Sequence, residues 1–143
     1  MNIKVKLLND KAQMPFKSTP YAAGADLYVT SWEFDDKCNI VYHTGIAMEI
    51  PEGFVGLLFP RSSSAGMLDH IMHNCVGVID SDYRGEILAK FMLTDESGFE
   101  RYDIGERCCQ MVVVPIPPTT YVQATELSKT ERDTKGYGQQ SGK

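Results

Sequence analysis

Short apolar segments separated by polar turns make up most of this chain of 143 residues. Residues 1–8 alternate between apolar and polar or charged side chains, which is typical of a strand with one buried face. Residues 54–59 and 111–116 are almost continuously apolar and short enough to be buried strands. About ten short strands with frequent turns, and no long amphipathic helix, predict an all-β protein with a jelly-roll-like β-sandwich or barrel.

Turn-forming residues mark where these strands end. A turn at Gly45 separates two short strands within residues 32–50, and residues 51–53 form the turn before the strand at 54–59. Residues 121–127 fit one further strand near the end of the chain.

The sequence GVIDSDYRGEI at residues 77–87 combines a short apolar strand, a polar turn and the start of a second apolar strand. It predicts a β-hairpin whose turn carries Asp80, Asp82 and Tyr83. Aspartate and glycine are common in ordinary turns, so this pattern alone leaves open whether the turn is functional. Polar side chains mounted between rigid strands are nevertheless well placed for binding or catalysis.

The serine-rich stretch PRSSSAG follows the strand at 54–59. Its small residues could form one or two helical turns with Ser62 or Ser63 as the N-cap, which would leave backbone N–H groups free beside Arg61. The stretch is therefore a candidate anion-binding loop. A plain serine-rich loop is the alternative, because a glycine-rich phosphate loop ahead of a long helix is missing.

Charge and cysteine content restrict the function further. A net charge of −5 with scattered Lys and Arg argues against a general nucleic-acid-binding protein. No segment approaches a membrane span, and residues 1–8 lack the apolar core of a signal peptide. Four cysteines without a CxxC pair indicate reduced thiols, each buried as a small hydrophobe, in a cytoplasmic protein, or a nuclear one if the source is eukaryotic or viral.

His70 and His73, close to Cys75, raise the question of a zinc site. There is no second ligand pair and no HExxH sequence, which argues against a metal held by these side chains. Two exposed or half-buried histidines are the preferred interpretation.

From Ser128 onward the chain is rich in polar residues and glycine, with Tyr137 as the single aromatic residue. Such a segment cannot pack by itself. We therefore expect a β domain at residues 1–127 and a flexible C-terminal arm at residues 128–143. The simple interpretation is a disordered terminus, although Arg132 and a glycine-flanked Tyr137 are suited to clamping phosphate and stacking on a base.

Five stretches, in this order and at these intervals, resemble the five motifs of the homotrimeric dUTP pyrophosphatases. They are residues 23–27 (AGADL), 60–63 (PRSS), 74–85 with the core GVIDSDYRG, 105–110 (GERCCQ), and 132–142 preceded by ELSKTER. The resemblance covers the whole chain. It departs from the family pattern at Ser63 for Gly, Cys108-Cys109 for small aliphatic residues, Tyr137 for Phe, and Gln139-Gln140 for Ser-Thr.

The resemblance implies Mg²⁺-dependent hydrolysis of dUTP to dUMP and pyrophosphate, which limits uracil incorporation into DNA and supplies dUMP for dTMP synthesis. Asp80 would be the general base, Arg61 its partner cation, and Asp26 at most an outer-shell contact of Mg²⁺. The substrate-binding residues that it implies are Arg61, Ser62, Ser63, Asn74, Gly77, Val78, Ile79, Tyr83, Gln110, Arg132, Gly136, Tyr137 and Gly138. It also implies a homotrimer whose sites are shared between subunits, with the arm closing over a site at a subunit interface.

Two other functions are compatible with parts of this pattern. A dCTP deaminase shares the fold and much of the third motif, but its catalytic Glu position is occupied by Lys90 here, so the acid-base residue is missing. A non-catalytic jelly-roll module that only binds nucleotide is the second. The presence of Asp80, Arg61 and Gln110 together speaks against it.

Overall fold

The computed structural model describes residues 1–62, 70–93 and 100–136, and these hold ten β-strands and no helix. The strands are β1 (Lys4–Leu7), β2 (Ala25–Tyr28), β3 (Ser31–Phe34), β4 (Ile40–His43), β5 (Ile46–Glu49), β6 (Phe54–Pro60), β7 (His70–Met72), β8 (Gly77–Ile79), β9 (Leu88–Leu93) and β10 (Arg107–Pro115). The predicted all-β class is confirmed.

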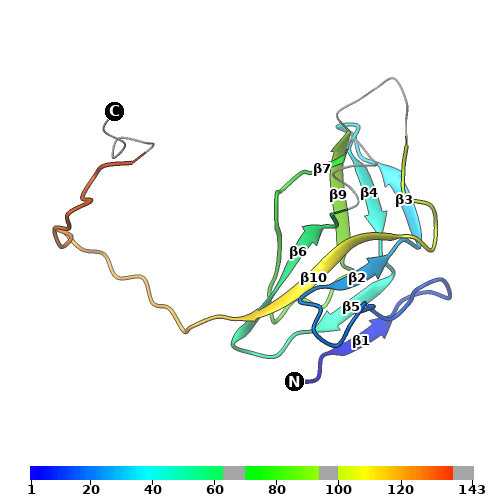
Figure 1. Cartoon of the computed structure of the whole chain (residues 1–143), viewed down its shortest axis with the longest axis horizontal. Helices are drawn as coiled ribbons and strands as arrows, with labels where there is room; N and C mark the ends of the chain where they lie inside the picture. The colour runs from blue at the N-terminus through cyan, green and yellow to red at the C-terminus, as the bar shows by residue number, and fades with distance from the viewer. Residues whose placement is uncertain (63–69, 94–99, 137–143) are drawn as a thin grey trace.

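Two four-stranded antiparallel sheets form the body of the domain, with β1 and β5 as a separate pair (Figure 1). One sheet has the strand order β2-β10-β6-β8, and the other has the order β3-β4-β9-β7. β10 is central in the first sheet because it pairs with β2 on one side and with β6 on the other. Neighbours in sequence, such as β5 and β6, thus lie in different sheets, as expected for a jelly-roll-like sandwich.

The apolar core draws on both four-stranded sheets. Tyr42 of β4 and Phe91 of β9 are fully buried, and their rings meet edge to face with centroids 5.8 Å apart. Further core residues are Leu27, Ile40, Leu58, Met72, Ala89 and Met111. Burial of these side chains stabilises the packing of the layers.

The predicted hairpin around Asp80 is wrong. β8 pairs with β6, whereas β9 pairs with β4 and β7 in the other sheet. Ile87 explains the difference, because it is fully buried and its N–H donates to the Ile46 oxygen at 2.9 Å. The turn at Asp80 therefore carries the chain from one sheet to the other. A strand-turn-strand pattern predicts the turn but not the partner of each strand.

Two further strand assignments differ from the sequence-based expectation. β7 begins at His70, where the sequence analysis considered a zinc site and expected no strand. The strand expected at residues 121–127 is not formed, since residues 116–136 contain no strand. Tyr121 and Leu127 are 95% and 89% exposed, and the segment extends away from the domain (Figure 1). A strand needs a partner, and this segment finds none within the described part of its own chain. The sheets end at Pro115, and the division of the chain at residue 127 stays a prediction.

His70 and two of the cysteines also differ from expectation. His70 is buried, and its Nε2 lies 2.9 Å from the Tyr42 hydroxyl, whereas His73 is exposed. Cys38 and Cys75 are exposed because they occupy turns with φ of 60° and 59°, whereas Cys108 and Cys109 are buried as predicted. All four cysteines are free thiols.

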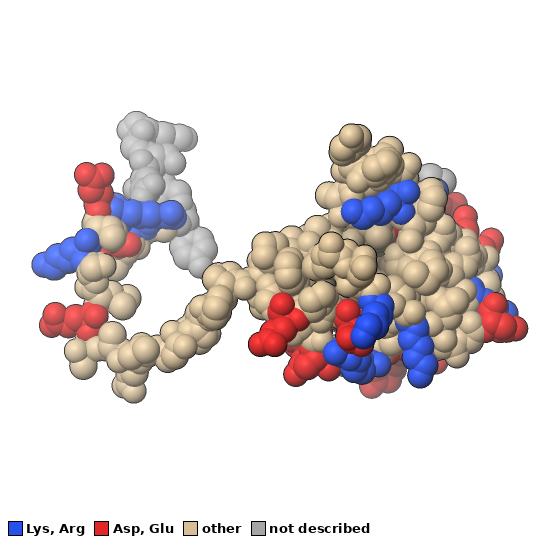
Figure 2. Space-filling model, turned by 90° about the horizontal axis from the view of Figure 1, so that it is seen from below, with Lys and Arg blue, Asp and Glu red and all other residues tan. Residues whose placement is uncertain are grey.

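Charges of both signs lie next to one another along one edge of the domain and on the arm (Figure 2). The face in view therefore lacks the massed positive charge typical of nucleic-acid-binding surfaces. The described part of the chain holds no helix with the length and hydrophobicity that a membrane span requires.

Candidate active site

Asp26 of β2 lies between two arginines at one end of the β2-β10-β6-β8 sheet. Its Oδ1 is 3.1 Å from Arg61 Nε, and its Oδ2 is 3.1 Å from Arg107 Nη1. Arg61 also donates from Nη1 to the backbone oxygen of Arg107 at 3.0 Å. The Asp26 side chain is only 16% exposed, so the ion pairs are well shielded from water. Two guanidinium groups against one carboxylate leave this cluster positive, which suits an anionic ligand.

A β-bulge in β10 brings Arg107 and Gln110 to the same face of the sheet. Arg107 pairs with Tyr28, and Gln110 pairs with Asp26. Between these two pairs the chain advances by two residues in β2 but by three in β10, so β10 contains one extra residue. Without the extra residue, positions 107 and 110 would face opposite sides. Sequence reasoning missed Arg107 for this reason, and its place in the motif GERCCQ was the available signal.

Gln110 occupies the space that a side chain at position 24 would need. Its Nε2 donates to the Pro60 oxygen at 3.0 Å, directly before Arg61. A Cβ on Gly24 would overlap Gln110 Oε1, so a larger residue there would push the Gln110 amide out of this position. The described parts of the first, second and fourth motif stretches, residues 23–27, 60–62 and 105–110, are thus in direct contact. Ser62 is exposed beside them, whereas Ser63 and the helical turns predicted after it lie outside the described residues.

Asp80 lies at the other end of the same sheet, in the turn after β8. It is exposed and lines an open hollow of about 690 Å³, together with Asp82, Arg84 and residues of the β5–β6 turn such as Glu52. The Tyr83 N–H donates to the backbone oxygen of Asp80 at 3.1 Å, and Arg84 Nη1 donates to the backbone oxygen of Ser81 at 2.6 Å. These local bonds fix the turn while its carboxylate remains accessible to water.

The Tyr83 ring folds back over Gly85. A Cβ on Gly85 would lie 2.3 Å from the Tyr83 hydroxyl, so glycine is required for the close approach. The hydroxyl donates to the Glu86 oxygen at 3.0 Å. Because Tyr83 is still 43% exposed, one part of its ring is free to pack against a ligand.

The residues predicted to contact the base form β8 and the turn before it. Gly77 is buried, and a Cβ there would lie 3.0 Å from Leu58 Cβ, so glycine lets β8 approach β6 closely. β8 is an edge strand, with Val78 63% exposed and Ile79 half-buried. An edge strand keeps backbone N–H and C=O groups available for a ligand. Asn74 is exposed in the preceding turn.

A single chain does not bring these two clusters together. The pairing of Gly56 with Ile79 places Asp80 beside Val55, at the start of β6. Arg61 follows the end of β6, about 20 Å further along at a rise of roughly 3.3 Å per residue. Arg61 therefore contacts Asp26, and the expected contact between Arg61 and Asp80 is not made within one chain.

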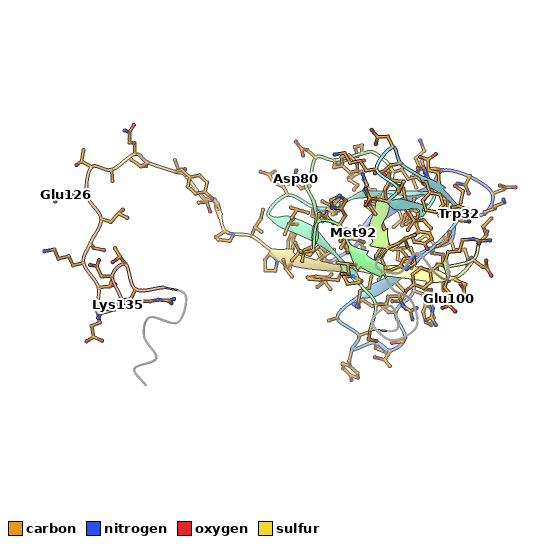
Figure 3. All side chains as sticks on the ribbon, turned by 90° about the horizontal axis from the view of Figure 1, so that it is seen from above. Trp32, Asp80, Met92, Glu100, Glu126 and Lys135 are labelled. Atoms are coloured by element: carbon orange, nitrogen blue, oxygen red, sulfur yellow. The ribbon has the colours of Figure 1, made fainter. Side chains whose placement is uncertain are left out.

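The arm carries the remaining predicted residues. Arg132 and Gly136 belong to its described part, where Arg132 Nε donates to the Lys135 oxygen at 3.1 Å. Figure 3 shows Lys135 of the arm, and Glu126 just before it, well apart from the sheets and from Asp80. Tyr137 and Gly138 lie outside the described residues.

Asp26 is the side chain that the family resemblance connects with a metal ion. Within residues 1–62, 70–93 and 100–136, no group of three or more His, Cys, Asp or Glu could hold a metal ion. Asp26 has each oxygen beside an arginine but keeps lone pairs that can accept from a metal-bound water. This donor set suits Mg²⁺ bound to phosphates and water, with Asp26 at most in the outer shell.

Comparisons with known proteins point to one family. The dUTPase family model matches residues 10–141. The chain is 40% identical to the deoxyuridine 5'-triphosphate nucleotidohydrolase of Hydrogenobaculum sp. strain Y04AAS1, over 96% of each protein. It is 36% identical to the protein of the same name from Syntrophotalea carbinolica, over 96% of this chain and 95% of that one.

A solved structure agrees with these sequence relatives. The dUTPase of Staphylococcus bacteriophage 80alpha with dUPNHPP has a TM-score of 0.83 and 28% identity, over 96% of this chain and 97% of that one. Fold and relatives together define a nucleotide hydrolase with a jelly-roll-like fold. The chain belongs to the dUTPase family. The family predicted from the five motifs, and the enzyme class of dUTP diphosphatase, are thereby confirmed.

Proposed function

We propose that this chain hydrolyses dUTP to dUMP and pyrophosphate, which limits uracil incorporation into DNA and supplies dUMP for dTMP synthesis. One observation carries the proposal: an accessible carboxylate beside a tyrosine stands at one end of β6, and a cationic cluster with an amide donor stands at the other. A nucleoside with a triphosphate needs both kinds of surface.

Asp80 is the proposed general base. It accepts a proton from a water molecule as that water attacks the α-phosphorus, and the bond to the bridging oxygen breaks so that pyrophosphate leaves. The local bonds of the turn hold the backbone that carries Asp80, which limits how far its carboxylate can move from a position for in-line attack. Arg61 neutralises charge on the phosphates, Gln110 donates a hydrogen bond to them through its amide, and the Ser62 hydroxyl is a second uncharged donor.

Base and sugar are selected by the other end of the sheet. The Asn74 amide offers both a donor and an acceptor to the uracil edge, next to the open backbone edge of Gly77, Val78 and Ile79. Tyr83 packs under the deoxyribose and leaves no room for a 2′-hydroxyl. The exposed part of its ring supports this role.

We propose that complete sites form only between the subunits of a homotrimer. The separation of about 20 Å along β6 is too large for Asp80 and Arg61 of one chain to act on adjacent phosphates. The arm reaches out from its own domain, which suits closure over a neighbouring site through Arg132, Gly136, Tyr137 and Gly138. Bound Mg²⁺ would neutralise the triphosphate, with Asp26 accepting from its water shell.

Incubation of the purified protein with dUTP, dTTP, dCTP and UTP in the presence of Mg²⁺ tests this function. Pyrophosphate should form from dUTP, with discrimination of roughly 10⁴ against dCTP, because unpaired polar groups in the site penalise the wrong base edge. UTP should also be a much poorer substrate because Tyr83 leaves no room for its 2′-hydroxyl, and dTTP because of its additional 5-methyl group. Ammonia release from dCTP would support the deaminase instead. That outcome is not expected, because Lys90 pairs with Asp35 at the position of the deaminase glutamate. Binding without turnover would support the non-catalytic module.

A further inference from the structure

Glu86 ties the exit of the Asp80 turn to the turn between β4 and β5. Its Oε1 accepts a hydrogen bond from the Gly45 N–H at 2.7 Å, and its Oε2 lies 3.0 Å from His43 Nδ1. The backbone oxygen of Glu86 accepts from the Tyr83 hydroxyl at 3.0 Å. One residue therefore links the proposed sugar-binding tyrosine to the other sheet.

The β4–β5 turn that holds this carboxylate is closely packed. Gly45 has φ of +66°, and a Cβ there would lie 2.7 Å from the Thr30 methyl group, so this position favours glycine. Ile87, the next residue after Glu86, is held independently by a backbone hydrogen bond to Ile46 and by the Thr44 hydroxyl. The Glu86 side chain can therefore affect the residues before Ile87 without moving β9.

We propose that Glu86 is a positioning residue for the Asp80 turn, and that protonated His43 is the cation that holds it there. This inference rests on the proposed function, because it gives these residues the task of supporting the dUTP site. Neither side chain has to touch the substrate. Both act through Tyr83, whose hydroxyl is fixed on Glu86 and whose ring closes on the deoxyribose.

Two carboxylates face the His43 ring. Glu86 approaches Nδ1, and Glu33 of β3 approaches Nε2 at 3.6 Å, whereas the strand partners Ser31 and Leu88 carry no charge. Burial lowers the pKa of His43, but hydrogen bonds and charges from Glu86 and Glu33 outweigh it, so the pKa lies above the usual 6.5. The ion pair is complete below pH 6.5 and is lost as the pH rises through this raised pKa.

The dependence of KM for dUTP on pH, between about pH 5.5 and pH 9, separates this role from a purely structural one. In the wild-type protein, KM should rise about tenfold as His43 loses its proton, because a charge-assisted hydrogen bond becomes a neutral one, and kcat should change less. Glu86→Gln keeps an acceptor for Gly45 but cannot form the ion pair. It should show the raised KM at every pH.

Two variants serve as comparisons. Glu33→Gln removes one of the two carboxylates that favour protonated His43, so the rise in KM should remain and move to lower pH. Asp35→Asn is the matched structural control, because Asp35 pairs with Lys90 of the same sheet without contacting the turn. It should lower stability and leave the pH dependence of KM unchanged.

A measurement of His43 itself adds a readout that needs no turnover. In an NMR titration of the free enzyme, the pKa of His43 should fall in Glu86→Gln and stay unchanged in Asp35→Asn. If Glu86→Gln fails to fold, His43→Gln should show the same raised KM without a pH step.

The outcomes distinguish this inference from the proposed function. If the wild type hydrolyses dUTP but shows no rise in KM, or if Glu86→Gln keeps that rise, the positioning role is overturned and the proposed function stands. If the wild type does not hydrolyse dUTP, the proposed function fails, and binding of a non-hydrolysable α,β-imido analogue of dUTP at low and high pH decides the inference in place of KM.

Discussion

The two ends of β6 are held in different ways. At the Arg61 end, ion pairs to Asp26, a guanidinium bond to a backbone oxygen, and the contact of Gln110 with Gly24 form an interlocked cluster. At the Asp80 end, an exposed turn is held by its own backbone and by Glu86. The proposed phosphate-binding end is thus preformed within one chain, whereas the proposed reactive end presents its carboxylate to solvent. In the proposed trimer, each chain contributes these ends to two different sites.

Asp80→Asn should have the largest effect on activity. The change is isosteric and removes only the proposed base, so kcat should fall on the order of a hundredfold or more while binding of the imido analogue stays nearly intact. The fold should survive, because the turn is closed by backbone bonds. Near wild-type kcat in this variant would show that the exposed end of β6 is not the reactive one.

Removal of the arm after Thr130 should have the next largest effect. It deletes Arg132 and the glycine-flanked Tyr137, and loss of a charge-assisted phosphate contact should lower kcat/KM roughly tenfold to a hundredfold. The trimer should still form, because the sheets end at Pro115. Size-exclusion chromatography with light scattering checks assembly. Full activity of the truncated protein would show that the arm does not contribute to the site.

Gly24→Ala tests the interlocked end. The new methyl group would displace the Gln110 amide, since a Cβ there lies 2.4 Å from its Oε1, and kcat/KM should fall by about tenfold or less. If the effect acts through Gln110, the double variant with Gln110→Ala should be no worse than Gln110→Ala alone. Additive losses in this cycle would show that Gly24 acts on something else.

The smallest effect on activity is expected outside both ends, at Asp35. Hydrogen bonds from Lys90 and then Asn39 hold the pKa of Asp35 well below its ordinary 3.8. A lowered pKa stabilises the fold above that ordinary value, and the contribution is lost as the pH falls. Asp35→Asn should therefore lower Tm at pH 7 and weaken the acid dependence of Tm, with kcat and KM unchanged. Equal Tm values for both proteins at neutral pH would contradict this.

The sequence predicts the parts of this molecule that depend on local pattern. The all-β class follows from short apolar runs, and the turn at Asp80 follows from its residues. Strand pairing is not local: β8 and β9 lie in different sheets because Ile87 is buried against β5, which no turn motif encodes.

The contacts within the candidate site were also not predictable from local sequence pattern. Arg107 reaches Asp26 only because a bulge reverses the expected alternation of β10. Glu86 and His43 are far apart in sequence, and their contact depends on the passage of the chain between the two sheets. Such contacts are set by tertiary packing and leave no periodic signal in the chain.

The shared site is tested most directly by mixing two variants. Asp80→Asn and Arg61→Gln are unfolded and refolded together in equal amounts, with mixed trimers confirmed by native mass spectrometry. Asp26 keeps Arg107 as a partner in Arg61→Gln, so that variant should fold. If Asp80 and Arg61 of each site come from different chains, both are intact with a chance of one half times one half, and activity should return to about a quarter of wild type. If both came from one chain, the mixed trimers would be no more active than the two parents.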